Sequence, residues 1–383
     1  MKVVTAIDSF KGSMTSMEAG FAAAEGIHRV DADAEVQVRP LADGGEGTVE
    51  ALVAGMNGKT EHVKVTGPLG EPVICKYGII ESTKTAVIEM AGAAGITQVP
   101  DEKRNPLYTT TYGVGEVIKD AIEKGCRRFI VGIGGSATND GGVGMLQALG
   151  YAFLDKDGKQ VLPGARGLKD ITEITAAYVI PELAECKFRV ACDVTNPLCG
   201  ELGCSSIYGP QKGATPEMIQ DMDQWLGAYA ELAKERFPKA DAKYPGTGAA
   251  GGMGFAFLTF CNATLESGIK IVLEETNLRQ YVQNADIVIT GEGRLDGQTV
   301  MGKAPIGVAK IAKEYSKPVL AFSGCVTKDA VACNAEGIDA FFPILRGVVS
   351  LEEAMHTDNA MTNMVDTVEQ VFRTIHTFTT VSK

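Results

Sequence analysis

Short clusters of glycine follow directly on apolar runs at several places in this chain, and they constrain its fold more than any other feature. Glycine accounts for 45 of the 383 residues, which is about 12% against about 7% in average proteins. The clusters have no collagen-like period and form no low-complexity tract. Because glycine lets the backbone approach another group closely, the clusters predict turns where the chain contacts a ligand or another segment.

The chain between the glycine clusters alternates between strand-like and helix-like patterns. Apolar runs predict strands at residues 2–8, 35–41, 127–133, 151–154, 188–192, 269–274, 285–290, 318–323 and 340–344. Amphipathic patterns predict helices at residues 14–29, 46–55, 112–124, 143–149, 216–236 and 305–315, and in the C-terminal tail. Residues 61–91 alternate and carry two turns, which predicts an antiparallel meander. Strand-then-helix units are typical of a parallel, doubly wound sheet.

The predicted fold class is therefore α/β with two domains. A Rossmann-like parallel-sheet domain is expected from residues 1–60, 106–150 and 280–383, interrupted by a second, mixed α/β domain from residues 61–105 and 151–279. Ligands of such sheets bind at the carboxyl ends of the strands, which is where the glycine clusters lie.

Composition excludes several classes of function. The 36 Lys and Arg residues against 48 Asp and Glu give a net charge of −12, which argues against a nucleic-acid surface. No apolar run reaches the length of a membrane-spanning helix, and Asp8 interrupts the region where a signal peptide would be apolar. Nine Cys without a CxxC pair and only four His argue against a zinc site and for reduced thiols in the cytoplasm.

The first two clusters join acids to glycines. Residues 8–13 (DSFKGS) close the first strand, and Lys11 with the following helix start would attract an anion; an ordinary strand-to-helix turn with a solvated lysine is the alternative. Residues 43–48 (DGGEGT) hold two carboxylates at the start of a helix, where they could bind a cation or only cap the helix.

The third cluster, residues 132–142 (GIGGSATNDGG), follows a predicted strand. Gly132, Gly134 and Ala137 match a dinucleotide fingerprint, and Asp155 lies near the expected distance. A nicotinamide dehydrogenase of a small hydroxy acid is therefore the main rival hypothesis. The extra Asp140 and two glycines fall where the dinucleotide helix should form, which favours a phosphate-binding loop of another kind.

The last two clusters add further charged groups. Residues 193–197 (DVTNP) and 209–213 (GPQKG) predict a substrate-side wall, with structural turns as the alternative. Residues 290–296 (TGEGRLD) lead to a near match of a Walker A loop, but Ala304 stands where Ser or Thr should bind magnesium, so a P-loop NTPase is excluded. Lys303 is expected at the start of the next helix, close to a phosphate. Basic groups beside many acids and glycines suit phosphoryl transfer, which depends on positioning and charge neutralisation.

With these residues in view, the chain closely resembles the bacterial glycerate kinase family (glycerate kinase type 1) over nearly its whole length. The matching stretches are residues 8–12, 43–48, 132–142, 196–198, 209–214, 248–254 and 289–294. The resemblance implies ATP-dependent phosphorylation of D-glycerate, with 2-phosphoglycerate favoured over 3-phosphoglycerate. It also implies a two-domain α/β fold with the site in the cleft between the domains, and a cytoplasmic role in glycolate, glyoxylate or sugar-acid breakdown. A small apolar residue is expected where Cys204 and Ser205 stand, a departure that bears on packing.

The residues themselves suggest individual roles. Glycerate and the transferring phosphoryl group are expected to be held by Lys11, Arg294, Lys212 and Ser9. The ATP phosphates are expected to be bound by Gly134, Gly135, Ser136, Asn139 and Lys303. Candidate ligands of Mg²⁺ are Asp43, Glu46 and Asp296. Asp193 is the first choice for the base, Asp296 is its rival, and Lys11 is a third catalytic candidate.

The expected partners are thus D-glycerate and ATP with Mg²⁺, without nucleic acid or membrane, for a monomer or homodimer. A non-catalytic sensor of sugar acids or nucleotides is the alternative from another functional class.

Overall fold

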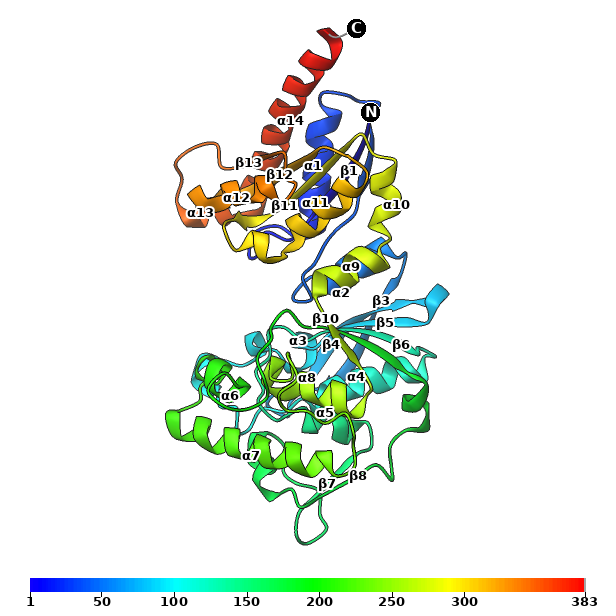
Figure 1. Ribbon diagram of the computed structural model, residues 1–383, viewed down its shortest axis with the longest axis vertical. Helices are drawn as coiled ribbons and strands as arrows, with labels where there is room; N and C mark the ends of the chain where they lie inside the picture. The colour runs from blue at the N-terminus through cyan, green and yellow to red at the C-terminus, as the bar shows by residue number, and fades with distance from the viewer. Residues whose placement is uncertain (382–383) are drawn as a thin grey trace. The chain divides into compact units, whose positions relative to one another are not determined.

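The chain folds into two compact units, each assembled from separate segments (Figure 1). The computed structural model describes the backbone of residues 1–381 and the side chains of residues 1–378. Unit 1 comprises Met1–Asp43, Glu50–Met56 and Ile269–Lys383, and unit 2 comprises Gly44–Val49 and Asn57–Gly268. Each unit has its own sheet and its own hydrophobic core.

Unit 1 is built on a five-stranded sheet of order β13-β12-β11-β1-β2, in which every neighbouring pair is parallel. Its strands are β1 (Lys2–Ile7), β2 (Glu35–Val38), β11 (Ile287–Leu295), β12 (Val319–Val326) and β13 (Ala340–Pro343). Its helices are α1 (Ser16–His28), α10 (Leu278–Gln283), α11 (Ala304–Glu314), α12 (Ala332–Ala335), α13 (Leu351–Met355) and α14 (Thr357–Val381). Two more helices cross the unit borders, namely α2 (Thr48–Gly55) and α9 (Gly268–Glu275).

Helices cover both faces of this sheet, because successive strand residues point to opposite sides. Val3 and Ile289 belong to the core cluster that also contains the apolar faces of α1 and α14. Val4 and Val288 are buried on the other face, where α11 contacts β11, β1 and β12. This is the doubly wound arrangement that the strand-then-helix pattern predicts.

Unit 2 contains a six-stranded mixed sheet of order β10-β9-β6-β5-β4-β3 and a separate antiparallel pair, β7-β8. Its strands are β3 (Lys59–Thr66), β4 (Pro72–Ile80), β5 (Thr85–Glu89), β6 (Arg128–Gly132), β7 (Ala152–Leu154), β8 (Glu173–Thr175), β9 (Lys187–Ala191) and β10 (Thr264–Glu266). Its helices are α3 (Ala91–Ala94), α4 (Tyr112–Glu123), α5 (Val143–Ala148), α6 (Cys204–Tyr208), α7 (Pro216–Lys234) and α8 (Ala249–Phe260). The strands from β5 to β10 run parallel, whereas β3, β4 and β5 form an antiparallel meander.

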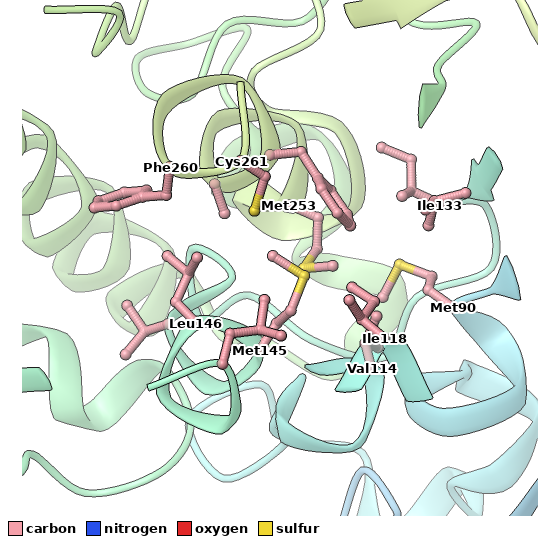
Figure 2. Close-up of a cluster of buried hydrophobic side chains, with 14 of the residues drawn as sticks. Met90, Val114, Ile118, Ile133, Met145, Leu146, Met253, Phe260 and Cys261 are labelled. Carbon is pink, nitrogen blue, oxygen red and sulfur yellow. The ribbon is translucent and has the colours of Figure 1, made fainter. Parts of the chain in front are cut away.

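The core of unit 2 is drawn from helices that are distant in the sequence. In Figure 2, Val114 and Ile118 of α4, Met145 of α5 and Met253 of α8 converge on the same apolar cluster. Met90, which follows β5, joins them. The packing of these helices fixes the loops at the carboxyl ends of β5 and β6.

Most of the predicted elements are confirmed, including the α/β class, the parallel sheets and the meander of residues 61–91. The prediction of a strand at residues 269–274 is wrong, because this segment belongs to α9. Its buried residues Ile269, Val272 and Leu273 lie at helical spacing. A short apolar run fits a strand or a buried helix equally well, so periodicity alone could not decide.

Two further predictions differ from the structure. The strand predicted at residues 285–290 is longer in the structure, where β11 continues to Leu295, paired with β12. The segment 106–150 was grouped with the first Rossmann-like domain, yet its strand β6 pairs with β5 and β9 in the sheet of unit 2. Alternation along the chain shows that a strand is followed by a helix, but it does not show which sheet the strand joins.

Within residues 1–381 there is neither a candidate membrane-spanning helix nor a disulfide bond. No helix within residues 1–381 combines the length and the apolar character that a membrane crossing requires. All nine cysteines are free thiols, and six of them are buried. Burial raises the pKa of Cys261 to about 12, so this thiol acts as a packing residue rather than as a thiolate.

Gly26 tests the close packing of α1 on α14. A Cβ atom at this position would lie 2.5 Å from the carbonyl oxygen of Val365 and 2.9 Å from Cβ of Val368. We expect Gly26→Ala to lower the free energy of unfolding by about 1–3 kcal/mol, because the added methyl group overpacks a backbone contact. Urea unfolding of the full chain measures the effect.

Gly227 on α7 provides the matched control. The nearest atom to a Cβ there is Sγ of Cys199, at 4.0 Å. Gly227→Ala should raise stability by up to about 1 kcal/mol, since alanine has the higher helix propensity. Equal effects of the two substitutions would contradict the close approach of α1 and α14.

Candidate active site

The carboxyl edge of the unit 1 sheet gathers three carboxylates from neighbouring strands. Asp8 directly follows β1, and Glu292 lies on β11 one residue beyond Gly291, which pairs with Ile7. Parallel pairing therefore places Asp8 beside Glu292 although they are far apart in the sequence. Asp43 follows β2, the neighbour of β1 on its other side. These side chains bring negative charge to one end of the sheet.

Burial makes two of these carboxylates hard to ionise. Asp8 is 6% exposed and Glu292 is 9% exposed. Burial, with the charge of Asp43 as a second cause, raises the pKa of Asp8 to about 6, although the N–H of Ser9 donates to its Oδ1 at 2.7 Å. Burial also raises the pKa of Glu292, whose Oε1 accepts a hydrogen bond from Thr299 Oγ1 at 2.7 Å. Near neutral pH this pair is poised to attract a proton or a cation.

Two lysines form ion pairs with carboxylates at this edge of the sheet. The Lys11 Nζ donates to Oδ2 of Asp43 at 2.8 Å. Burial opposes the charge of Lys11, but the hydrogen bond and the charge of Asp43 outweigh it, so the pKa of Lys11 is raised. The Lys303 Nζ lies 3.9 Å from Glu292 and 3.7 Å from Asp296. Each lysine therefore stands between the sheet edge and any anion that approaches it.

Near its carboxyl end, β11 presents Arg294 to solvent. Asp296 is fixed in the turn after β11, with its Oδ1 accepting a hydrogen bond from the N–H of Gln298 at 3.0 Å. Arg294 contacts Asp296 through Nε at 3.3 Å, and its side chain is 65% exposed. Lys303 is the N-cap of α11, and Pro305 stands in the first turn of that helix, as the sequence predicts.

In unit 2, glycines allow one backbone segment to lie directly on the carboxyl ends of β6 and β9. A Cβ at Gly132 would lie 2.3 Å from the carbonyl oxygen of Gly44. A Cβ at Gly44, where φ is +90°, would lie 2.4 Å from Cβ of Ala191. The segment 44–47 therefore requires glycine for packing, and its carboxylate, Glu46, is exposed.

The loop 133–142 joins β6 to α5. Gly134 and Gly135 are exposed, whereas Ser136 is 7% exposed. The loop is tied on one side by a hydrogen bond from the N–H of Ile96 to the carbonyl of Gly135, at 2.8 Å. This tie holds the two exposed glycines at the surface of unit 2.

Lys212 and Asn139 lie behind this loop rather than on its exposed side. Lys212 is 2% exposed, and its Nζ donates to Oγ of Ser136 at 2.7 Å and to the carbonyl of Thr138 at 2.6 Å. Burial lowers the pKa of Lys212 to about 8. Asn139 is fully buried and donates through Nδ2 to Oγ of Ser205 at 2.8 Å. Both side chains therefore hold the loop from within.

Asp140 anchors the far end of the loop and was not among the predicted site residues. It is 1% exposed, and its Oδ2 accepts hydrogen bonds from the N–H and Oγ1 of Thr111, both at 2.9 Å. Its Oδ1 accepts from the N–H of Gly142 at 3.1 Å. Burial raises its pKa, against these hydrogen bonds. The sequence did carry a signal for Asp140, because it is an acid inside a glycine-rich loop and stands directly before two glycines.

Asp193 lies on the same edge of the unit 2 sheet as the loop 133–142. It follows β9, which pairs with β6 so that Ala191 is opposite Gly132. Its side chain is exposed and accepts a hydrogen bond from the N–H of Gly268 at 3.2 Å, at the start of α9. The carboxylate thus serves at least as a helix cap.

The structure contradicts the hypothesis that residues 132–142 and Asp155 form a dinucleotide site. The fingerprint requires that the strand after the loop and its helix join the same parallel sheet. Here β7 pairs with β8 in a separate antiparallel pair, and Asp155 lies in a turn in which its N–H donates to the carbonyl of Lys159. The third cluster is therefore not a Rossmann dinucleotide site.

The predicted site residues thus fall into two groups, one in each unit. Unit 1 holds Ser9, Lys11, Asp43, Arg294, Asp296 and Lys303. Unit 2 holds Glu46, Gly134, Gly135, Ser136, Asn139, Asp193 and Lys212. Asp8, Glu292 and Asp140 lie inside the recognised motifs, but the sequence analysis assigned them no individual role. Among the described residues, no three His, Cys, Asp or Glu side chains are grouped to hold a metal ion by themselves.

Comparison with known proteins agrees with the resemblance seen in the motifs. The model of the glycerate kinase family matches residues 3–376. A glycerate kinase of Haemophilus influenzae is 48% identical over 375 residues, which are 98% of this chain and 99% of that protein. A glycerate 2-kinase of Escherichia coli is 48% identical over 354 residues, 92% of this chain and 93% of that protein.

A solved structure extends the likeness to three dimensions. The crystal structure described as "putative glycerate kinase 2" from Salmonella typhimurium LT2 matches with a TM-score of 0.91 and 45% identity, and the match covers 99% of each chain. Both the sequence and the fold therefore place the chain in one family: it belongs to the glycerate kinases.

Proposed function

We propose that this protein transfers a phosphoryl group from ATP to D-glycerate with the help of Mg²⁺, in the cytoplasm, and that the product is 2-phosphoglycerate. The observation that carries the proposal is the set of buried carboxylates and lysines at the carboxyl edge of the unit 1 sheet, in a member of the glycerate kinase family. The name of the Escherichia coli relative, glycerate 2-kinase, supports the 2-hydroxyl as the acceptor.

The glycerate carboxylate is assigned to Arg294, Lys11 and Ser9. Arg294 is 65% exposed, and its Nε lies 3.3 Å from Oδ2 of Asp296, so much of its guanidinium is accessible. A planar guanidinium matches a carboxylate in two parallel hydrogen bonds. Lys11, in the turn that follows β1, adds positive charge, and Ser9 supplies a hydroxyl on the same turn.

The ATP phosphates are assigned to the exposed part of the loop 133–142. Gly134, Gly135 and Ser136 offer backbone N–H groups and a hydroxyl without bulky side chains. Asn139 supports the loop through Ser205 instead of contacting the nucleotide. Lys303 belongs to the unit 1 group and is assigned to the transferring phosphoryl group, whose charge it would neutralise.

Mg²⁺ fits the oxygen donors in this chain, because it is usually bound by one or two carboxylates together with substrate phosphates. Asp43, Glu46 and Asp296 are the proposed ligands. In the structure Asp43 forms an ion pair with Lys11. Asp296 forms ion pairs with Lys303 and Arg294. Bound Mg²⁺ would supply charge neutralisation for the phosphates.

Asp193 is assigned as the base that accepts the proton of the glycerate hydroxyl, with Asp296 as the second candidate. Asp193 stands beside the loop 133–142 on the same sheet edge, and its bond from Gly268 fixes its orientation. A loose transition state makes deprotonation late, so the reaction does not require a strongly basic group at this position.

The activity itself is tested by adding D-glycerate and Mg-ATP to the purified protein. Release of ADP that depends on D-glycerate is the expected result, and a phosphorus NMR spectrum identifies the product. ADP release with 3-phosphoglycerate as the product would correct the position of transfer. Binding of both substrates without ADP release would instead identify a sensor.

Substitution of Arg294 tests its assignment to the substrate carboxylate. Arg294→Lys keeps the charge but removes the planar fork. The KM for D-glycerate should rise about tenfold to a hundredfold, as expected for the loss of a charge-assisted hydrogen bond, while the KM for ATP should stay nearly unchanged.

Arg279→Lys is the matched control for this change. Arg279 forms a bidentate ion pair with Glu314 at the opposite end of α11 from Lys303. Its substitution should leave both KM values unaltered. If Arg294→Lys instead raised only the KM for ATP, Arg294 would be a phosphate ligand.

Asp193→Asn separates a catalytic role from helix capping. If Asp193 is the base, kcat should fall by about 10² to 10⁴ while ATP still binds. Initial rates at several Mg²⁺ concentrations show whether added metal restores the rate, as it would for a metal ligand. A melting curve recorded beside them reports the loss of the cap.

Thr215→Ala provides the control for capping alone. The Thr215 Oγ1 accepts a hydrogen bond from the N–H of Met218 at the start of α7, and its loss should cost about 1 kcal/mol of stability without changing kcat. A similar result for Asp193→Asn would refute the base assignment and leave Asp296 as the candidate.

A further inference from the structure

Lys212 is a buried cation without an ion-pair partner. It is 2% exposed, and its two hydrogen-bond acceptors, Oγ of Ser136 and the carbonyl of Thr138, are both neutral. No carboxylate in the described part of the chain forms an ion pair with its Nζ. Burying an unpaired charge is costly. A negatively charged ligand close to Lys212 would offset this cost.

The bond to Lys212 determines the direction of the Ser136 hydroxyl. An ammonium group only donates hydrogen bonds, so Oγ of Ser136 must accept from Nζ at 2.7 Å. The hydroxyl proton of Ser136 then points away from the lysine, and none of the described residues accepts it. Charged Lys212 therefore makes Ser136 an obligatory donor.

The neighbouring backbone offers two more donors at the same place. Gly134 and Gly135 are exposed, and their N–H groups donate to no acceptor within residues 1–381. Gly135 has a left-handed φ of +73°, and successive N–H groups around such a residue form concavities that bind anions. Bonds from Ile96 to Gly135 and from Ala137 to Ala94 hold the loop from its other side.

We propose that Lys212 is a positioning residue that acts through Ser136: its ammonium fixes the hydroxyl as a donor, and this hydroxyl binds a nucleotide phosphate together with the N–H groups of Gly134 and Gly135. The proposal rests on the proposed function, which makes a nucleotide the ligand of this loop. It gives Lys212 a different role from the direct contact with glycerate predicted from the sequence.

The action of Lys212 through the Ser136 hydroxyl, which we call the relay, depends on the charge of Lys212 and therefore on pH. Burial lowers the pKa of Lys212 to about 8. A bound anion favours the charged amine, so the nucleotide should bind most tightly below this pH and more weakly above it. The neutral amine can accept a hydrogen bond, which lets the Ser136 hydroxyl turn inward and lose its ligand.

Other charged or titratable groups also face Lys212. These are Asp140 on the loop 133–142 and Cys204 on α6. Burial raises the pKa of Cys204 to about 11. Since both groups remain in a Lys212→Met variant, that variant isolates the contribution of the lysine.

The test measures the affinity of the full chain for ADP with Mg²⁺ by isothermal titration calorimetry, from neutral pH into the alkaline range. The variants are Ser136→Ala, Lys212→Met and the double substitution, with inorganic pyrophosphate as a probe that carries phosphates alone. Each single substitution should weaken both ligands about tenfold to a hundredfold at neutral pH. The double variant should lose little more, because both residues act through one hydroxyl.

The pH series identifies the lysine as the origin of the effect. Affinity for ADP should fall with rising pH in the unaltered protein and stay flat in both single variants. Affinity for D-glycerate should not change in any of them. If Lys212→Met fails to fold, Ser136→Ala still decides the question, because it retains the lysine and removes only the hydroxyl.

Several outcomes would overturn the relay. These are additive losses in the double variant, an unchanged pH dependence in Ser136→Ala, or weakened binding of D-glycerate instead of ADP. Failure of the proposed function is distinct, because it is a lack of phosphoglycerate formation by the unaltered protein. A protein that forms 2-phosphoglycerate but binds ADP independently of Lys212 would refute the relay alone.

Discussion

Parallel pairing of neighbouring strands is the constraint on which both groups of candidate residues depend. Parallel strands all end at one edge of a sheet, so pairing of Ile7 with Gly291 brings Asp8 to Glu292. In unit 2, pairing of Gly132 with Ala191 brings the loop 133–142 to Asp193. The residues at each edge come from distant parts of the chain, and only the register of the sheet makes them neighbours. A shift of this register would separate the charges even if every residue were retained.

The same arrangement leaves charged groups where the fold alone would not place them. Burial raises the pKa of Asp8 and of Glu292 and lowers that of Lys212. Perturbed groups of this kind concentrate at functional sites. Ordinary packing needs none of them, because the cores around α1, α14, α4 and α8 are apolar. These groups lie at the two sheet edges and not in the cores. Their position distinguishes the candidate site residues from the residues that only support the fold.

Local signals in the sequence were sufficient for most elements and for the motifs of the site. Apolar runs correctly located β1 and β6. Sheet membership was beyond local signals, because nothing in residues 127–133 shows that β6 joins β5 rather than β1. For the same reason the sequence could not show that Asp8 and Glu292 lie side by side, because only strand pairing brings them together. It named Lys212 from its glycine neighbours, but burial behind the loop is a property of the packed fold, so the expected contact with substrate does not match its position.

A chain with a net charge of −12 still has to bind two anionic substrates, if it acts as proposed. Net charge matters little at this range, because exposed charges are screened within about 10 Å by salt. What matters is where individual cations stand. Lys11 and Lys303 are held against carboxylates, which keep them in place but partly cancel their field. Lys212 has no such partner and lies in a medium of low polarisability, so its field is weakened least. A single buried lysine behind a glycine loop can therefore attract a phosphate more strongly than several lysines on an acidic surface.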